Sequence, residues 1–179
     1  MTLVFNASPI ITLAKAGLLD SILRLTNQVI VPRSVADEIA RFNDPSDAAC
    51  IWLEKPVAAT FLRDDPATSD FVAGWALGAG ESSVISLVQA HPDSIAVLDD
   101  LAARRCAGAL RLKMVGTLGL LLLAKKAGLF HTICGPLEAI VAAGLFVSPK
   151  HLADVQRQAG EYDYLSNIPS HRTCPVCLE

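Results

Sequence analysis

Short apolar runs alternate with helix-like segments along most of the chain. Three of these runs are Leu3–Phe5, Gln28–Pro32 and Ile95–Leu98, and each is followed by a segment with apolar residues at helical spacing. Lys113–Thr117 predicts a further short strand, which precedes a leucine-rich helix. Strands that alternate with helices in this way are typical of a parallel sheet covered by helices. We therefore predict an α/β fold.

Residues that favour helix ends set the expected boundaries. Ser8 suits an N-cap and Pro9 the first helical position, and Gly17 is a candidate break in the helix that runs on to about residue 25. Gly78–Gly80 separates two helices and leaves Glu81 in the first turn of the second. Residues 57–62 predict a short strand. The other predicted helices cover residues 34–42, 44–53, 70–77, 81–90, 101–110, 118–127, 134–143 and 149–159.

Length and composition limit the class of protein. With 179 residues, 52% of them hydrophobic and 18% charged, the chain is long enough for one compact domain with a substantial core. We expect this domain over residues 1–160, followed by a C-terminal tail over residues 161–179 that is flexible or binds a partner. No apolar run approaches the roughly 20 residues of a membrane-spanning helix, and no secretory signal is visible. We therefore expect a cytoplasmic protein that does not enter a membrane.

The net charge bears on the partners of the protein. It is −3, from 15 Lys and Arg residues against 18 Asp and Glu residues. A chain of this charge does not coat nucleic acid by bulk electrostatics. An enzyme that contacts a few phosphates through local basic residues remains compatible with it.

The exit of the strand at Ile95–Leu98 is the clearest candidate for chemistry. Asp99 and Asp100 follow this strand directly, and a helix begins after them. Open α/β sheets bind their ligands at the carboxyl ends of the strands. Two adjacent carboxylates repel each other unless a cation or a positive partner compensates them. A helix cap needs only one carboxylate, which Asp100 can supply, so the pair predicts a metal site.

Three more residues share this topological position. Asn6, Glu38 and Glu81 each follow a strand or lie in the first turns of a helix that begins near a strand exit. Oxygen ligands of this kind suit Mg²⁺ or Mn²⁺. Each residue also has a purely structural interpretation: Asn6 as a turn residue, Glu38 as a solvated helix residue, and Glu81 as the acid of a helix N-terminus. Their combined placement favours the metal site.

Five segments, in this order along the chain, carry a resemblance to a known family. They are Val4–Ile11, Val31–Ile39, Gly78–Ile85, Leu98–Arg104 and Val115–Gly119. As a set they resemble the PIN domain, and specifically the branch close to the VapC toxins of bacterial and archaeal toxin–antitoxin pairs. The resemblance covers about residues 3–160. It implies a three-layer α/β/α sandwich with a central, mostly parallel sheet.

The resemblance also implies a metal-dependent endoribonuclease, in which four acids hold Mg²⁺ or Mn²⁺ and RNA phosphodiesters are hydrolysed. Asn6 falls where the first Asp of the family stands, Glu38 on the second acid and Glu81 on the third. Asp100, or else Asp99, falls on the fourth. Of this pair we prefer Asp100 as the ligand, with Asp99 as a supporting acid.

Other residues would assist the site. Ser8 and Thr117 fall at positions that can offer hydroxyl groups. Arg104 and Arg105 follow the acids by one helical turn, and one of them can contact a phosphate, although a solvated helix face explains both equally well. The partners implied by the family are an RNA substrate, an antitoxin protein, and a second copy of the chain in a homodimer.

Asn6 is the point at which the chain departs from the family pattern. An amide still coordinates a cation through its oxygen, but it removes a negative charge and so weakens metal affinity and water activation. Two other functions therefore stay open. One is a PIN-like binding module with little or no catalytic activity, and the other is a Rossmann-like nucleotide-binding protein that nucleotides, and not Mn²⁺, would stabilise.

The C-terminal tail contains a separate motif. Cys174 and Cys177 form a Cys-x-x-Cys pair, and His171 precedes it by three residues. A structural Zn²⁺ needs four ligands, so this set is incomplete unless His151 or a second chain completes it. We rank a chance occurrence or an unstructured terminus above a Zn²⁺ site at Cys174 and Cys177.

Overall fold

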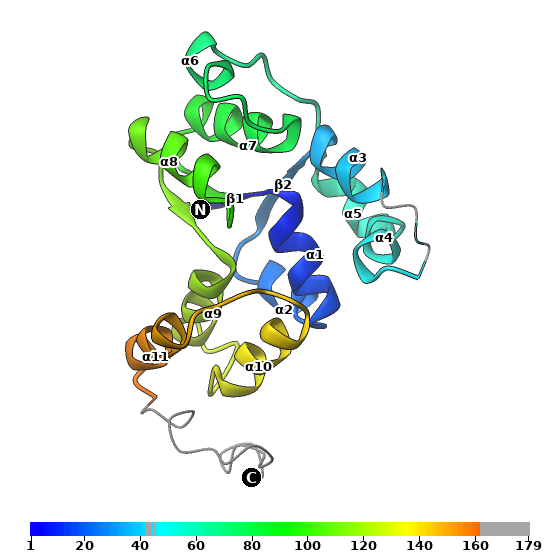
Figure 1. Cartoon of the computed structure of the whole chain (residues 1–179). Coiled ribbons are helices and arrows are strands. Elements are labelled where there is room, and N and C mark those ends of the chain that lie inside the picture. The colour runs from blue at the N-terminus through cyan, green and yellow to red at the C-terminus, as the bar shows by residue number, and fades with distance from the viewer. Residues whose placement is uncertain (42–43, 45, 162–179) are drawn as a thin grey trace.

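A sheet of five parallel strands forms the centre of the molecule (Figure 1). The structure is a computed structural model, and it describes residues 1–41, 44 and 46–161. The strand order is β3-β2-β1-β4-β5, and every neighbouring pair is parallel. The strands are β1 (Thr2–Phe5), β2 (Gln28–Pro32), β3 (Leu62–Arg63), β4 (Ser94–Val97) and β5 (Met114–Val115).

Helices cover the sheet in two layers. In one layer, α7 contacts β1, β2 and β4 and packs against α8, and in the other, α1 packs against α2, α9 and α10 (Figure 1). The expected three-layer α/β/α sandwich is therefore confirmed. The helices are α1 (Ala7–Lys15), α2 (Leu19–Leu23), α3 (Arg33–Arg41), α4 (Ala48–Leu53), α5 (Pro56–Phe61), α6 (Asp70–Ala73), α7 (Ala79–Ala90), α8 (Leu101–Ala109), α9 (Thr117–Lys126), α10 (Cys134–Ala142) and α11 (Pro149–Gln158).

The central strands read as continuous apolar runs because both of their faces are buried. Leu3, Val4 and Phe5 of β1 are fully buried, as are Val97 and the following Leu98 at the end of β4. Burying one such side chain contributes about 1.5–3 kcal/mol. Burial of this kind holds the carboxyl ends of β1 and β4 in place.

Glycines end several helices where the sequence predicts it. Gly17 has a φ of 69° and separates α1 from α2, and Gly128 and Gly144 follow α9 and α10 with φ values of 75° and 101°. These left-handed conformations are open to glycine without steric cost.

Several expected boundaries are wrong. Residues 57–62 form helix α5 and only the start of β3, because Pro56 occupies the first helical position and two alanines favour the helix over its β-branched neighbours. The helix at 70–77 ends at Ala73, because Gly74 is its C-cap and Ala76 adopts a φ of 51°. The strand at 113–117 contains only Met114–Val115.

Three helix starts also differ from the expectation. Asn6, and not Ser8, is the N-cap of α1, so Ser8 and Pro9 both lie inside the first turn. Helix α7 begins at Ala79, two residues before Glu81, which nevertheless stays in the first turn as expected. Thr117 is likewise the first residue of α9 and not the end of a strand.

The order of the strands places two sequence-distant exits side by side. β1 lies between β2 and β4, and the direction of the connections along the sheet reverses between β1 and β4. Phe5 is in register with Val97, and the backbone N–H of Asn6 donates to the Val97 carbonyl at 3.1 Å. Ligands of open α/β sheets bind at such a reversal point, beyond the carboxyl ends of the strands. Asn6 and Asp99 follow these two strands.

Within residues 1–41, 44 and 46–161, no helix has the length and apolar character needed to cross a membrane.

Candidate functional site

Asn6 combines two unusual features. It occupies the N-cap position of α1, for which asparagine is well suited, yet its side chain makes no capping hydrogen bond. The residue is only 3% exposed, and its Oδ1 atom is buried without a hydrogen-bond partner among the described residues. Leaving such an atom unsatisfied costs about 1–3 kcal/mol. The amide oxygen is therefore held in place for a contact that the described part of the protein does not supply.

Glu38 faces the same space as this amide oxygen. A Cβ atom on Gly80 would lie 2.9 Å from Glu38 Oε2 and 3.2 Å from Asn6 Oδ1. Glu38 is half-buried in α3, and its carboxylate accepts no hydrogen bond from any described residue. Burial raises the pKa of Glu38, the charge of Glu81 raises it further, and Arg41 acts in the opposite direction. A carboxylate in this position is stabilised by a cation.

Glu81 joins this pair from helix α7. Its charge is close enough to raise the pKa of Glu38. Glu81 Oε2 also accepts a hydrogen bond from the Gly78 N–H at 2.9 Å, so Glu81 satisfies the backbone donor of the N-cap residue of α7. The structural interpretation of Glu81 as a helix N-terminal acid is thus observed, and its other carboxylate oxygen remains available to a ligand.

Asp99 and Asp100 differ in their surroundings. Asp100 is exposed and is the N-cap of α8, where its Oδ1 accepts from the Ala103 N–H at 2.8 Å. Asp99 is half-buried, and its two oxygens accept from the N–H of Thr117, at 2.8 Å, and from the Thr117 hydroxyl. Thr117 itself is fully buried. The geometry thus orients Asp99 through Thr117 and occupies Asp100 with the helix cap.

The remaining expected residues are distributed around this edge of the sheet. Arg104 is half-buried, and its Nη1 donates to the Leu98 carbonyl at 2.9 Å, so it braces the end of β4. Arg105 is exposed on α8, and Ser8 is exposed in the first turn of α1. Gly116, which the sequence pattern does not single out, lies where a Cβ atom would come within 2.9 Å of Asp99 Oδ1.

The donor set fits a hard divalent cation only in part. Asn6, Glu38 and Glu81 offer oxygen atoms, which Mg²⁺ and Mn²⁺ prefer, and the Asn6 oxygen is buried without a hydrogen-bond partner among the described residues. In the part of the chain that the structure describes, no group of three or more His, Cys, Asp or Glu residues is arranged to hold a metal ion. Asp99 and Asp100 therefore do not complete a group of three acids with Glu38 and Glu81, although the sequence predicts that these residues converge. The Cys174 and Cys177 motif and His171 lie outside the described residues.

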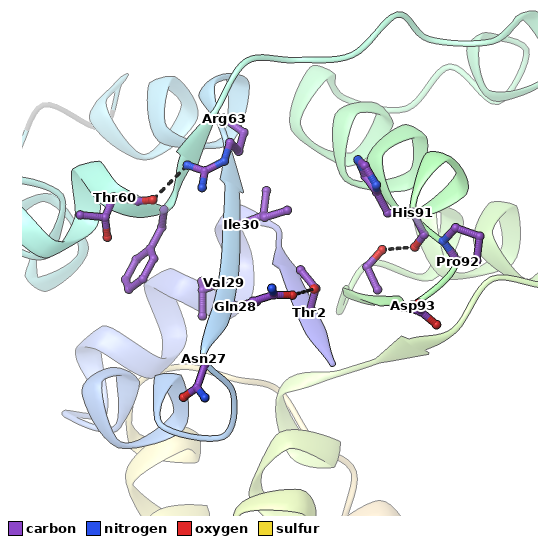
Figure 2. Close-up of a pocket in the computed structure, with 12 residues that line it drawn as sticks. Thr2, Asn27, Gln28, Val29, Ile30, Thr60, Arg63, His91, Pro92 and Asp93 are labelled. Carbon is purple, nitrogen blue, oxygen red and sulfur yellow. Dashed lines mark hydrogen bonds between the residues drawn. The ribbon is translucent and has the colours of Figure 1, made fainter.

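Two cavities lie near the sheet. One, of about 520 Å³, opens at the amino ends of β1, β2 and β4, with Arg63 and His91 on opposite sides of it (Figure 2). This is the edge opposite to Asn6 and Glu38, so this cavity is not part of the acidic site. The other, of about 480 Å³, is lined by Asp99 and Arg104 together with apolar side chains of α9. It begins beside the candidate site.

Sequence patterns do not reveal the roles of Gly80 and Gly116, because the role of each glycine depends on which side chains pack against it. The adjacency of each glycine to an acidic residue or to a strand exit is the signal that is present in the sequence. Position alone does not distinguish such a glycine from one that breaks a helix.

Comparisons with known proteins agree with this arrangement. A family model described as a PIN domain matches residues 2–161. No curated protein and no solved structure gives a significant match. The model covers nearly the whole described fold, including β1, α3, α7 and the end of β4. By this match, and with a parallel α/β/α sandwich that gathers Asn6, Glu38 and Glu81 near one edge of its sheet, the chain belongs to the PIN-domain family, whose fold is of the nuclease type.

Proposed function

We propose that this protein is an endoribonuclease that depends on Mg²⁺ or Mn²⁺ and hydrolyses RNA phosphodiesters. One observation carries the proposal: the Asn6 amide oxygen is buried, has no partner among the described residues, and faces the same space as the Glu38 carboxylate, with Glu81 nearby. A protein gains no stability from this arrangement. A cation bound by oxygen atoms of Asn6, Glu38 and Glu81 would explain why this arrangement is present.

The residues take distinct roles in this proposal. Asn6, Glu38 and Glu81 hold the cation, Asp100 is the further acid expected from the sequence, and Asp99, oriented by the hydrogen bonds from Thr117, is a supporting acid. We keep the ranking expected from the sequence, because both oxygens of Asp99 accept hydrogen bonds from Thr117, whereas only Oδ1 of Asp100 is engaged by the cap of α8. A bound divalent cation would supply Lewis-acid stabilisation for the negative charge that develops on a phosphoryl oxygen.

Basic residues would help to position the RNA. Arg105 is exposed one turn beyond the acids and is free to approach a phosphate, whereas Arg104 is held by the Leu98 carbonyl. We assign phosphate contact to Arg105 and a structural role to Arg104. Ser8, exposed near the start of α1, is a further hydroxyl within the same region.

The biological role we propose is that of the toxin in a toxin–antitoxin pair, inhibited by an antitoxin protein and acting as a homodimer. The resemblance of the five acid-bearing and flanking segments to VapC-like chains supports this role. Induced expression should arrest growth, and the Glu38→Gln variant should not. Light scattering coupled to gel filtration should give twice the mass of the 19.0 kDa chain.

A second function has its own supporting observation. Asn6 stands where an acid is expected, and the described residues include no cluster of three acidic or other metal-ligating side chains. A PIN-domain binding module that holds RNA without cleaving it is compatible with this deficit. The two functions differ in one measurable property, which is metal-dependent cleavage.

The experiment uses the full chain, single-stranded RNA and Mn²⁺. Cleavage should require the metal, be lost in Glu38→Gln, and persist in Asp37→Asn, an equal change of charge at an exposed position of the same helix. Cleavage by neither Mg²⁺ nor Mn²⁺ would reject the enzyme and favour the binding module. Cleavage that Glu38→Gln retains would show that the activity lies elsewhere.

A further inference from the structure

We propose that Gly80 is a positioning residue of the metal site, because its lack of a side chain allows the Asn6 amide and the Glu38 carboxylate to face one shared space. This inference rests on the proposed function, since it concerns the same two ligands. Gly80 is the second residue of α7 and is buried where α7 packs against α3.

The backbone of α7 does not itself require glycine at this position. Gly80 has a helical conformation and is not among the residues of positive φ. Alanine is the better helix former, so helix propensity alone favours alanine there. The reason for glycine is therefore found in what surrounds its Cα atom.

Three atoms surround the position that a Cβ atom would take. Glu38 Oε2 would lie 2.9 Å away, Val35 Cγ2 3.0 Å away and Asn6 Oδ1 3.2 Å away. The first of these distances is shorter than real Cβ contacts, so one of the atoms must move. Val35 and Asn6 are buried and held by the core, whereas the Glu38 carboxylate is the far end of a flexible side chain.

The easiest response to a methyl group is thus a displacement of the Glu38 carboxylate away from Asn6. The fold tolerates this movement, because no hydrogen bond to a described residue holds the carboxylate. A cation that needs both oxygens does not tolerate it, since metal sites depend on ligand positions within a fraction of an ångström. Substitution of Gly80 should therefore separate folding from metal binding.

The test compares Gly80→Ala with Gly108→Ala by isothermal titration with Mn²⁺, together with thermal unfolding in EDTA. Gly108 is a matched control in α8, where a Cβ atom would make an ordinary contact of 3.6 Å with Met114 Cε and would touch no acid. We expect Gly80→Ala to remain folded and to lose affinity for Mn²⁺ by roughly tenfold or more. Gly108→Ala should keep the affinity within about twofold.

A double variant separates the ligands from simple packing. In Val35→Ala/Gly80→Ala the contact with the Val35 methyl group is relieved, while the contacts with the two oxygens remain. We expect this variant to bind Mn²⁺ as poorly as Gly80→Ala, whatever stability the loss of two buried methyl groups costs it. Wild-type affinity in the double variant would overturn the inference, because it would assign the effect of Gly80 to packing against Val35.

The outcomes also distinguish this inference from the proposed function. A wild-type chain that binds no Mn²⁺ rejects both. A wild-type chain that binds Mn²⁺, together with a Gly80→Ala variant of equal affinity, rejects only the role of Gly80. If Gly80→Ala fails to fold, the Mn²⁺ affinity of the double variant is used instead. Weak binding supports the role of Gly80, and wild-type affinity rejects it.

Discussion

At the scale of single residues, the side chain of Asn6 does not make the capping hydrogen bond that its position allows. Its position at the start of α1 offers a capping hydrogen bond, and its amide oxygen instead lies buried without a partner among the described residues. Glu38 is similar, because its carboxylate is half-buried beside another acid. Groups that lower stability in this way cluster at functional sites. We therefore expect Asn6 and Glu38 to lower the stability of the metal-free protein and to contribute to the binding of a cation.

Asn6→Asp tests whether position 6 contributes to cation binding at a cost in metal-free stability. We expect Mn²⁺ affinity to rise by roughly tenfold, because the number of charged ligands sets the affinity of such sites. Cleavage of RNA should accelerate as well. In EDTA the variant should unfold at a lower temperature, since a third carboxylate joins Glu38 and Glu81. Asn27→Asp, at an exposed position beyond the opposite edge of the sheet, is the control, and an unchanged affinity in Asn6→Asp would remove Asn6 from the ligand set.

Glu38→Gln should stabilise the metal-free protein at neutral pH. The folded-state pKa of Glu38 is raised, so its ionisation costs stability above that pKa. The cost disappears as the pH falls toward the ordinary glutamate value of about 4.3. Because Glu38 is partly exposed, we expect a gain of at most about 1 kcal/mol, or roughly 2–4 °C in melting temperature. Thermal unfolding in EDTA between about pH 4 and pH 8, a range that begins near the ordinary glutamate pKa, measures this gain in stability. A Glu38→Gln variant that is less stable than the wild type at neutral pH would contradict this account.

At the scale of elements, apolar periodicity predicts the central strands and most helices because burial follows that pattern. Leu3–Phe5 and Ile95–Leu98 are largely buried, and their exits lie at the reversal of the sheet. Residues 57–62 mislead because the β-branched Val57 and Thr60 favour a strand, whereas Pro56 at the first helical position and two alanines favour the helix that forms. The end of α6 at the Gly74 C-cap is a local feature that the apolar periodicity alone does not reveal.

The candidate site is predictable from the sequence to the extent that topology determines it. Strand exits at one edge of a sheet must be neighbours, and this rule alone brings Asn6 and the aspartate pair together. The choice between Asp99 and Asp100 as a ligand depends on the direction and the hydrogen bonds of each side chain, which topology does not determine. The role of Gly80 depends on the packing of α7 against α3, which the apolar periodicity of the sequence does not predict.

Glu161→Gln tests how the last helix is attached. Burial acts to raise the pKa of Glu161, and hydrogen bonds from Lys125, the Ile133 N–H and the Thr132 hydroxyl outweigh it, so the pKa is lowered. These contacts stabilise the fold above the unfolded pKa, and the gain is lost as the pH falls through the folded pKa. We expect Glu161→Gln to cost about 1–2 kcal/mol at neutral pH and little in acid.

Urea unfolding of the wild-type protein and of Glu161→Gln at several pH values measures this loss of stability. Asp154→Asn removes only a surface ion pair with Arg157 and should cost less than about 0.5 kcal/mol. Equal losses in the two variants would mean that Glu161 does not anchor the segment after α11.

At the scale of the whole molecule, charge limits how RNA can be held. The net charge of −3 gives no overall attraction for nucleic acid, and carboxylates at the edge of the sheet repel phosphates unless a cation compensates them. RNA must then be bound through few phosphate contacts and through the cation. Affinity for RNA should therefore depend only weakly on salt and strongly on Mn²⁺.

Arg105→Ala should reduce the slope of log affinity against log salt concentration by about one, because it removes one phosphate contact. The measurement uses the Glu38→Gln background, in which RNA stays intact, and fluorescence anisotropy at several salt concentrations. Arg24→Ala, at the exposed end of α2, should leave the slope unchanged. The same slope for Arg105→Ala and the parent protein would exclude Arg105 from the RNA contact.

The function proposed for this protein depends on a divalent cation held by Asn6, Glu38 and Glu81. Anomalous diffraction from crystals grown with Mn²⁺ tests this site most directly, because it locates the metal without relying on activity. We predict one peak within coordination distance of Asn6 Oδ1 and of the Glu38 and Glu81 carboxylates, close to Gly80. A peak elsewhere on the protein, or none at a saturating Mn²⁺ concentration, would contradict the account.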